Sequence, residues 1–338
     1  MSKMTTGMAP FSIVDIRAEP GTRASGYVPV ATRIDGSTIG IPVIVVNGTE
    51  PGPVLSVDAS CHGDEHEGTL AVLRLAQRLD PSRLRGTFIG VMALNVPAVE
   101  AMQRGNPFDH WNSDLNRLFP GALDGNLTQR IAHVHVNDIA GKADFSISLH
   151  SGASYVYWSP QGVCGQNQAS VELAQALGEE WNVLWQQGGE RAPLTGNCTS
   201  ALNARGVAAI TIEVGGAAER LPGPFDKNVD YIVNGIINVM RTYGMLEGQP
   251  TRARSWTLVR QRAVRSGKAG MIVPEPNLTL RSFVEQGTPL LRLYNLLGQE
   301  VEVVTAPIDG LVMGIRTYQY YPPGWPLVWM GEIVGQLP

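Results

Sequence analysis

Two side chains able to bind a metal ion stand at the end of a predicted apolar strand. The segment CHGDEHEG, residues 61–68, follows the run PVLSVDAS, so His62 and Glu65 lie where a strand passes into a helix. A neutral imidazole and a carboxylate three residues apart can both reach one zinc ion. In open α/β sheets, ligands bind beyond the carboxyl ends of the strands. This spacing and position predict a metal site, and Gly63 is expected to allow the tight turn that lets the two side chains converge.

Two further strand ends carry the same kind of residue. His150 follows the run ADFSISL, and Glu213 follows VAAITI. Each of them alone fits a satisfied core histidine or a helix-capping carboxylate. A polar group beside a buried strand is costly unless it is compensated, and here three separate strand ends agree. We therefore expect the three to meet at a metal-centred active site.

A fourth segment supplies cations. In NSDLNRLFPG, residues 112–121, Asn116 and Arg117 place an amide beside a planar guanidinium. This pair suits a substrate carboxylate, which arginine grips through two parallel hydrogen bonds; a structural salt bridge is the competing interpretation of Arg117. Arg104, a short distance upstream, is a second cation that could polarise a carbonyl group.

The elements that must position these residues alternate between apolar strands and amphipathic helices. Strands are predicted at 39–46, 53–60, 86–93, 143–149 and 207–212, and helices at 66–79, 128–140, 171–178 and 226–243. This alternation predicts an α/β layered domain with a mainly parallel sheet. From residue 256 onward, short strand-like runs are separated by glycine and proline, which predicts an all-β module. We divide the chain into an N-terminal segment, 1–35, a catalytic domain, 36–247, and a C-terminal β domain, 248–338.

Composition excludes several classes of protein. The 338 residues carry 26 basic and 30 acidic side chains, a net charge of −4, and 43% are hydrophobic. Such a chain is neither compositionally disordered nor a strongly basic nucleic-acid binder. Three cysteines form no disulfide framework and fit a reducing compartment. No apolar run of membrane-spanning length and no secretory signal is apparent, so we expect a cytoplasmic protein without a membrane or nucleic-acid partner.

Taken together, the motifs resemble the succinylglutamate desuccinylase/aspartoacylase family, a branch of the zinc carboxypeptidase-like hydrolases. The resemblance covers roughly residues 36–245, and its motifs match in order. They are His62-Gly-Asp-Glu65, Asn95-x-Pro97, Arg104, Asp114-Leu-Asn116-Arg117-x-Phe119-Pro-Gly121, His150 and Glu213-Val-Gly215. Within the family, the opening motif is similar to that of N-acetyl-diaminobutyrate deacetylases.

The resemblance implies a fold and a function. The fold would be a three-layer αβα domain with a mixed, largely parallel sheet, followed by a smaller all-β, barrel-sandwich-like domain. The activity would be zinc-dependent hydrolysis of the amide bond in an N-acyl amino acid or a related small carboxylate-bearing amide.

It also implies roles for single residues. One zinc ion per subunit would be held by three ligands, His62, Glu65 and His150. Glu213 would be the general base and Arg104 would stabilise the oxyanion. The substrate carboxylate would be bound by Asn116 and Arg117.

Other functions remain open from the sequence. A zinc carboxypeptidase acting on short peptides would share the same centre, and a metal-binding protein without turnover is a third class. The C-terminal runs resemble a lipoyl- or biotinyl-type domain, but the lysine that such domains modify is not apparent, so no covalent cofactor is expected. That domain would instead wall the active-site entrance or form contacts in a homo-oligomer.

A rival metal site can be tested directly. His62-Gly-Asp-Glu65-His66 also fits the H-x-x-E-H pattern, in which both histidines bind zinc on one helix. Gly63 and Asp64 are poor residues for a helix interior, and this arrangement leaves His150 and Glu213 without roles. Replacing His66 with alanine is therefore expected to leave zinc bound, as measured by metal analysis of the purified variant. Near-total loss of zinc would support the rival site instead.

Overall fold

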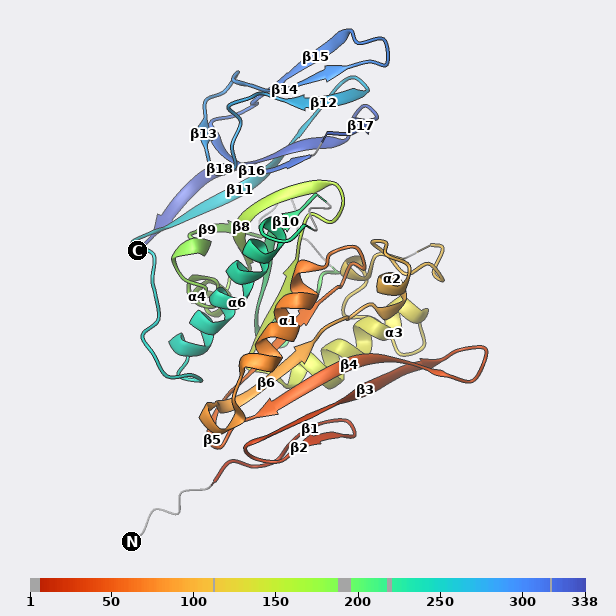
Figure 1. Cartoon of the computed structure of the whole chain (residues 1–338), viewed down its shortest axis with the longest axis vertical. Coiled ribbons are helices and arrows are strands. Elements are labelled where there is room, and N and C mark those ends of the chain that lie inside the picture. The colour runs from red at the N-terminus through yellow and green to blue at the C-terminus, as the bar shows by residue number, and fades with distance from the viewer. Residues whose placement is uncertain (1–6, 112, 188–195, 218–220, 317) are drawn as a thin grey trace.

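A long mixed sheet runs through the molecule (Figure 1). The computed structural model describes residues 7–111, 113–187, 196–217, 221–316 and 318–338. In spatial order the strands of this sheet are β13 (Phe283–Val284), β16 (Gly310–Arg316), β18 (Pro326–Leu337), β11 (Trp256–Arg265), β9 (Val183–Gln186), β8 (Val156–Cys164), β10 (Ala208–Gly216), β7 (Phe145–His150), β5 (Glu50–Ala59), β6 (Arg85–Val91), β4 (Thr38–Asn47) and β3 (Thr22–Thr32).

The four central strands are parallel. β10 pairs with β7, β7 with β5, and β5 with β6, all in the same direction. Strands β8 and β4, which flank them, run antiparallel to their neighbours β10 and β6. Because the central strands share one direction, their carboxyl ends lie at the same edge of the sheet.

Helices cover both faces of the sheet and make the three layers. On one face lie α1 (Glu67–Arg78), α4 (Gln168–Gln175) and α6 (Pro224–Thr242). The opposite face carries α3 (Leu127–Val134), with its π-helical continuation η3 (His135–Ile139), and α5 (Cys198–Asn203). The short elements are α2 (Val96–Glu100), η1 (Pro81–Arg83), η2 (Leu115–Arg117), η4 (Ala140–Lys142) and η5 (Glu179–Trp181).

Helix α1 shows why the sequence folds in this way. Ala71, Val72 and Leu75 are buried on one side of the helix, against the sheet. Glu67 stands in its first turn and Arg78 in its last, where their charges complement the helix dipole. Local sequence also explains the start of α6. Pro224 is its first residue, where proline is favoured because it has no N–H to leave unpaired.

The predicted α/β elements are confirmed, with shifted ends. The strands expected at 39–46, 53–60, 86–93 and 143–149 are β4, β5, β6 and β7, and the strand at 207–212 extends to Gly216 in β10. The helix expected over 128–140 is α-helical only to Val134 and then widens into η3. The sequence analysis missed β3 and β8, whose mixed polar and apolar residues give no apolar run, as well as the short hairpin β1 (Phe11–Ile13) and β2 (Ile16–Ala18).

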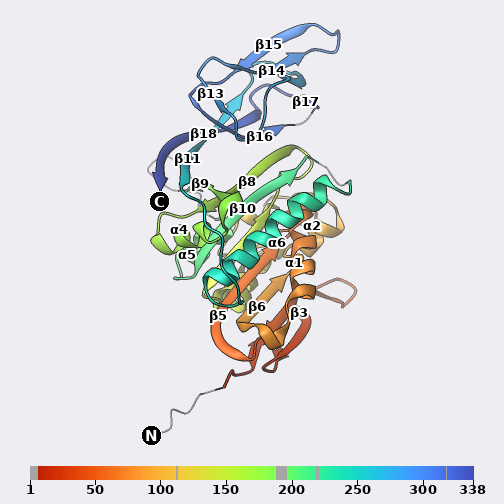
Figure 2. The same cartoon turned by 60° about the vertical axis from the view of Figure 1, so that its left-hand side comes forward.

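The C-terminal strands continue the sheet and also build a second one. β11, β16 and β18 belong to the long sheet, whereas β15 (Glu300–Thr305), β14 (Pro289–Tyr294), β12 (Gly270–Pro274) and β17 (Tyr320–Tyr321) form a separate four-stranded sheet. The apolar residues between these two layers make their own core, which includes Ile272, Leu291 and Val328. Figure 2 shows this region at the end of the molecule opposite β1 and β2. A domain boundary near residue 247 stays a prediction.

Among the described residues, no helix is long and apolar enough to cross a membrane.

The C-terminal strand β16 packs tightly against β8 of the α/β part of the chain. β16 pairs with β8, and a Cβ added to Gly314 would stand 2.4 Å from the ring of Trp158. That ring packs against Trp329, with the two centroids 5.0 Å apart, so it has little room to move.

Replacing Gly314 with alanine is expected to lower the free energy of unfolding by about 1–3 kcal/mol, through overpacking. Chemical denaturation followed by tryptophan fluorescence measures the change. Gly335→Ala in β18 is the matched control, because its Cβ would meet only Leu258 at an ordinary 3.7 Å. Equal stability of the two variants would contradict the prediction.

Candidate metal centre

The ends of β5, β7 and β10 bring the predicted residues together. His150 is the last residue of β7, and it pairs in register with Glu213 of β10. His62 and Glu65 lie between the end of β5 at Ala59 and the start of α1 at Glu67. His62, Glu65 and His150 are at most 4% exposed, so all three side chains meet in a buried place.

Close backbone packing fixes the segment that holds His62 and Glu65. A Cβ on Gly63 would stand 2.0 Å from the carbonyl carbon of Ala98, so only glycine fits there. The sequence predicts that Gly63 allows a tight turn. In the structure, glycine is needed at this position because the backbone of residue 63 packs directly against the backbone of α2. A hydrogen bond across the same segment adds to this, because the Ser60 hydroxyl donates to the backbone oxygen of Glu65 at 3.2 Å.

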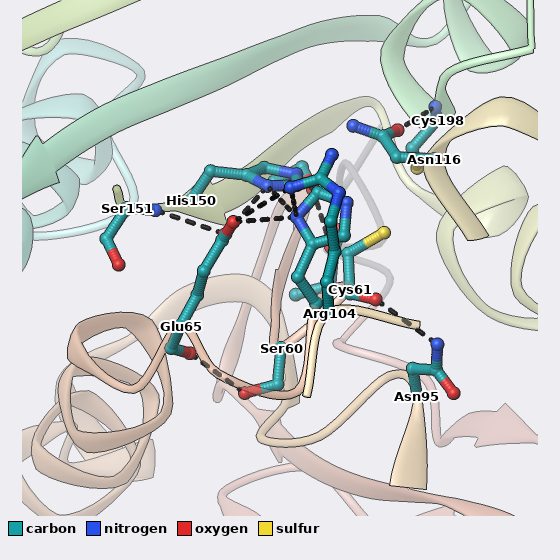
Figure 3. A network of polar contacts seen from close by, with 12 residues as sticks. Ser60, Cys61, Glu65, Asn95, Arg104, Asn116, His150, Ser151 and Cys198 are labelled. Carbon is teal, nitrogen blue, oxygen red and sulfur yellow. Dashed lines mark hydrogen bonds and ion pairs between the residues drawn. The ribbon is translucent and has the colours of Figure 1, made fainter. Parts of the chain in front are cut away.

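Two ring nitrogens and one carboxylate converge on a single point (Figure 3). His62 Nδ1 lies 2.7 Å from Glu65 Oε1, and His150 Nδ1 lies 2.9 Å from Glu65 Oε2. The two Nδ1 atoms are 3.2 Å apart. Tetrahedral ligands held about 2.0–2.1 Å from zinc stand about 3.3 Å from one another, so the pair of nitrogens has the spacing that the ion needs.

The other ring nitrogens have partners that fix each imidazole. His62 Nε2 lies 3.1 Å from Asp114 Oδ1, and His150 Nε2 lies 3.4 Å from the hydroxyl of Ser148. Metal-binding histidines characteristically hold their second nitrogen against a carboxylate or another polar group, which sets the tautomer and the ring orientation. With Nε2 engaged, Nδ1 of each ring faces the Glu65 carboxylate, where the three groups could share an ion, and these residues fit a zinc ion.

The charges of this cluster favour a cation. Burial opposes ionisation of Glu65, but attraction to His62 and His150 outweighs it and lowers the pKa of Glu65. Burial likewise opposes protonation of His62, yet Glu65 and Asp114 raise the pKa of its ring. A proton on His62 thus supplies positive charge where a metal ion would supply it.

Glu213 stands beside this cluster without a hydrogen-bond partner for one of its oxygens. Its Oε2 is buried and unpaired among the described residues. Burial raises the pKa of Glu213 to about 8, an effect that His150 opposes and Glu65 reinforces. A cation bound next to it would lower this pKa and leave a carboxylate poised to accept a proton.

The predicted cation Arg104 lies at the mouth of the cluster. Its Nε and Nη2 each lie 3.1 Å from Asp114 Oδ2, and its Nη1 lies 3.7 Å from Glu65 Oε1. The side chain is 48% exposed, so it borders solvent as well as the buried ligands.

Asn116 and Arg117 lie on η2, directly after Asp114. The carboxamide oxygen of Asn116 accepts from the backbone N–H of Cys198 at 3.1 Å, so that end of the side chain holds the start of α5 (Figure 3). Arg117 is exposed and donates to the backbone oxygen of Asn116 at 2.8 Å. The structure thus brings both residues to the segment that carries Asp114, without showing what they bind.

The sequence analysis gave no role to Asp114, Ser148 or Glu67. Asp114 links His62 to Arg104, and Ser148 stands behind His150. Glu67 accepts from the backbone N–H of Gly216 at 2.8 Å, which ties α1 to the end of β10 just beyond Glu213. Asp114 belongs to the recognised Asp-x-Asn-Arg motif, which was a signal for it, but its partner follows only from the fold.

The rival histidine pair does not have the helical setting that it requires. His62 and Glu65 precede α1, and His66 is the residue that caps it. Among the described residues, the groups of metal-binding side chains include His62, Glu65 and His150 but not His66.

This fold belongs to a known class. Residues 51–243 match the model of the succinylglutamate desuccinylase/aspartoacylase catalytic domain, and the chain belongs to that family. The family consists of hydrolases that remove acyl groups through amide-bond cleavage, which supports hydrolysis of N-acyl amino acids by this chain.

Named relatives refine the comparison. The N-alpha-acetyl-L-2,4-diaminobutyric acid deacetylase of Halomonas elongata is 27% identical over 328 residues, which cover 92% of each protein. A product-bound structure of the ectoine utilization protein EutE (DoeB) from Ruegeria pomeroyi is 24% identical, with a TM-score of 0.80 over 96% of this chain and 98% of that one. A family member from Rhodobacter sphaeroides has a TM-score of 0.79 at 24% identity, over 93% and 96% of the chains. The fold predicted from the motifs is confirmed.

Replacing Asp114 with asparagine is expected to weaken zinc binding about 10–100-fold, because the carboxylate that orients His62 is lost. Competition with a chelator of known affinity measures the change. Asp109→Asn is the matched control, since Asp109 lies in the same stretch of chain but accepts from Thr128 and Asn106 instead. Equal zinc affinity in both variants would show that Asp114 does not position the ligand.

Proposed function

We propose that the chain is a zinc-dependent amidohydrolase that removes the acyl group from an N-acyl amino acid. The observation that supports it most strongly is the convergence of His62, Glu65 and His150, with Glu213 in register beside His150. Three protein ligands leave one position of a tetrahedral ion open, which is the pattern of catalytic rather than structural zinc sites. When bound, zinc would polarise the scissile carbonyl and lower the pKa of a coordinated water.

Glu213 would move the proton in this reaction. Its unpaired Oε2 is available to a water, because no described side chain competes for it. As a carboxylate, it would take a proton from the attacking water and then pass that proton to the nitrogen of the leaving amine.

Arg104 would stabilise the negative charge that develops on the carbonyl oxygen. Asp114 fixes the position of the half-exposed Arg104 side chain through two contacts, and Nη1 stands 3.7 Å from Glu65 Oε1. A fixed cation next to the reacting carbonyl needs little reorganisation as the charge forms.

Asn116 and Arg117 would bind the substrate carboxylate. The exposed guanidinium of Arg117 forms no ion-pair contact among the described residues, although its charge acts on Asp114, so it can donate to a carboxylate of a ligand. Asn116 has one end anchored on Cys198 and would offer its amide nitrogen. These two residues would make a free carboxylate a requirement of the substrate.

The substrate class can be tested on the purified enzyme with a panel of N-acyl amino acids. N-acetyl-2,4-diaminobutyrate comes first, because the relative from Halomonas elongata is named for that substrate. N-succinyl and N-acetyl derivatives of other amino acids, together with short peptides, complete the panel. Preference for peptides over every N-acyl amino acid would overturn the proposed substrate class.

Replacing Glu213 with glutamine is expected to lower kcat by at least about 100-fold on the best substrate of the panel, because the proton acceptor is lost. Zinc content should stay at the wild-type value, since Glu213 is not a proposed ligand. Parallel kinetics and metal analysis separate the two effects. A fully active Glu213→Gln variant would exclude this mechanism.

A further inference from the structure

A second group of metal-binding side chains lies in the interior and shares no residue with the first. It consists of Asp58 on β5, His135 at the start of η3 and Cys198 at the start of α5. One ligand atom from each of them lies within 4.8 Å of the others. Asp58 and His135 have no exposed surface, and Cys198 is 1% exposed.

Three polar atoms of this group lack a hydrogen-bond partner among the described residues. Asp58 Oδ1 and both ring nitrogens of His135 make no hydrogen bond within the described chain. His135 Nε2 lies 3.3 Å from Asp58 Oδ1, but the arrangement is not that of a hydrogen bond. Leaving a carboxylate oxygen and an imidazole without partners in a dry interior is costly, so something is expected to satisfy them.

The surroundings hold the unpaired atoms in place. The second oxygen of Asp58, Oδ2, accepts from the Ser148 hydroxyl at 2.7 Å, which leaves Oδ1 to the cluster. Cys198 is held by its backbone N–H, which donates to Asn116. The ring of His135 packs edge-on against Phe119, with the centroids 6.2 Å apart.

We propose that Asp58, His135 and Cys198 bind a second zinc ion, whose fourth ligand would be a buried water and which joins the three elements that carry these residues. Carboxylate, imidazole and thiolate are the three ligand types that zinc accepts, and cysteine binds it as the thiolate. One carboxylate and one thiolate balance the two charges of the ion, so the complete site is neutral and can stay buried. The separation of 3.3 Å between His135 Nε2 and Asp58 Oδ1 matches two ligands of one tetrahedral ion.

This ion would tie together three elements that support the active site. β5 leads directly to His62, η3 continues the helix α3 that packs beside the sheet, and α5 contacts Asn116. Ser148 stands between the two groups, since its hydroxyl donates to Asp58 and lies 3.4 Å from His150 Nε2. The second ion would therefore stabilise the position of Ser148, which contacts the ring of His150.

Titration of the metal-free, full-length protein with Co²⁺ tests the proposal. We expect two equivalents to bind, with an absorption band in the near ultraviolet from charge transfer between a thiolate and cobalt. Replacing Cys198 with serine should remove this band and reduce the binding from two equivalents to one. Cys164→Ser is the matched control, because that thiol is equally buried but packs in the core on the other face of the sheet.

Two further variants separate the sites. Cys61→Ser tests the thiol next to His62 and should retain the band and both equivalents. His135→Asn should lose one equivalent, which keeps the test informative if Cys198→Ser fails to fold. Wild-type protein that saturates at one equivalent without the band would overturn the proposal, and so would a band lost in Cys61→Ser but retained in Cys198→Ser. The thiolate band reports on the second site alone, so its presence in the wild type and its loss in Cys198→Ser do not depend on hydrolysis or on the first metal site.

Discussion

The register between the parallel strands β5, β7 and β10 is the constraint on which the site depends. Ile147 and Leu149 of β7 face one helical layer, so Ser148 and His150 must face the other. The same alternation puts Glu213 beside His150 and Asp58 beside Ser148. A slip of one residue in either pairing would turn these polar side chains into the apolar core. Burial of the apolar side chains on one face of the sheet therefore determines which polar side chains lie on the opposite face.

Charge balance is the second requirement. Glu65 and Asp114 bring negative charge to a place where a proton on His62 and the guanidinium of Arg104 compensate it. Buried charges are tolerated only when they are paired. A metal ion at the two Nδ1 atoms meets the same requirement with neutral imidazoles, and it leaves Asp114 and Arg104 as a fixed pair at the rim. The metal centre and its surroundings thus form one electrostatic unit.

The main elements and the residues of the candidate metal centre could be predicted from the sequence, but the contacts between them could not. His62, Glu65, His150 and Glu213 were found because each follows a strand with a clear apolar pattern. Ser148 and Asp58 lie inside such strands, and nothing in their spacing shows that they face each other across β7 and β5.

His135 illustrates a different limit. The sequence analysis gave His135 no role, because no neighbouring residue in the chain marks it as a metal ligand. The partners of His135 come from β5 and α5, far away in the chain, and helix α3 gives way to a π-helical turn where His135 stands. β3 and β8 were missed for a related reason, because their burial depends on pairing rather than on a local apolar run.

The central claim is that His62, Glu65 and His150 hold a zinc ion on which hydrolysis depends. Anomalous diffraction from crystals of the zinc-loaded protein, recorded on both sides of the zinc absorption edge, tests it most directly. The account predicts an anomalous peak about 2.0–2.2 Å from Nδ1 of both histidines and from the carboxylate of Glu65. No peak at that position, or a zinc ion bound by His66 in place of His150, would contradict it.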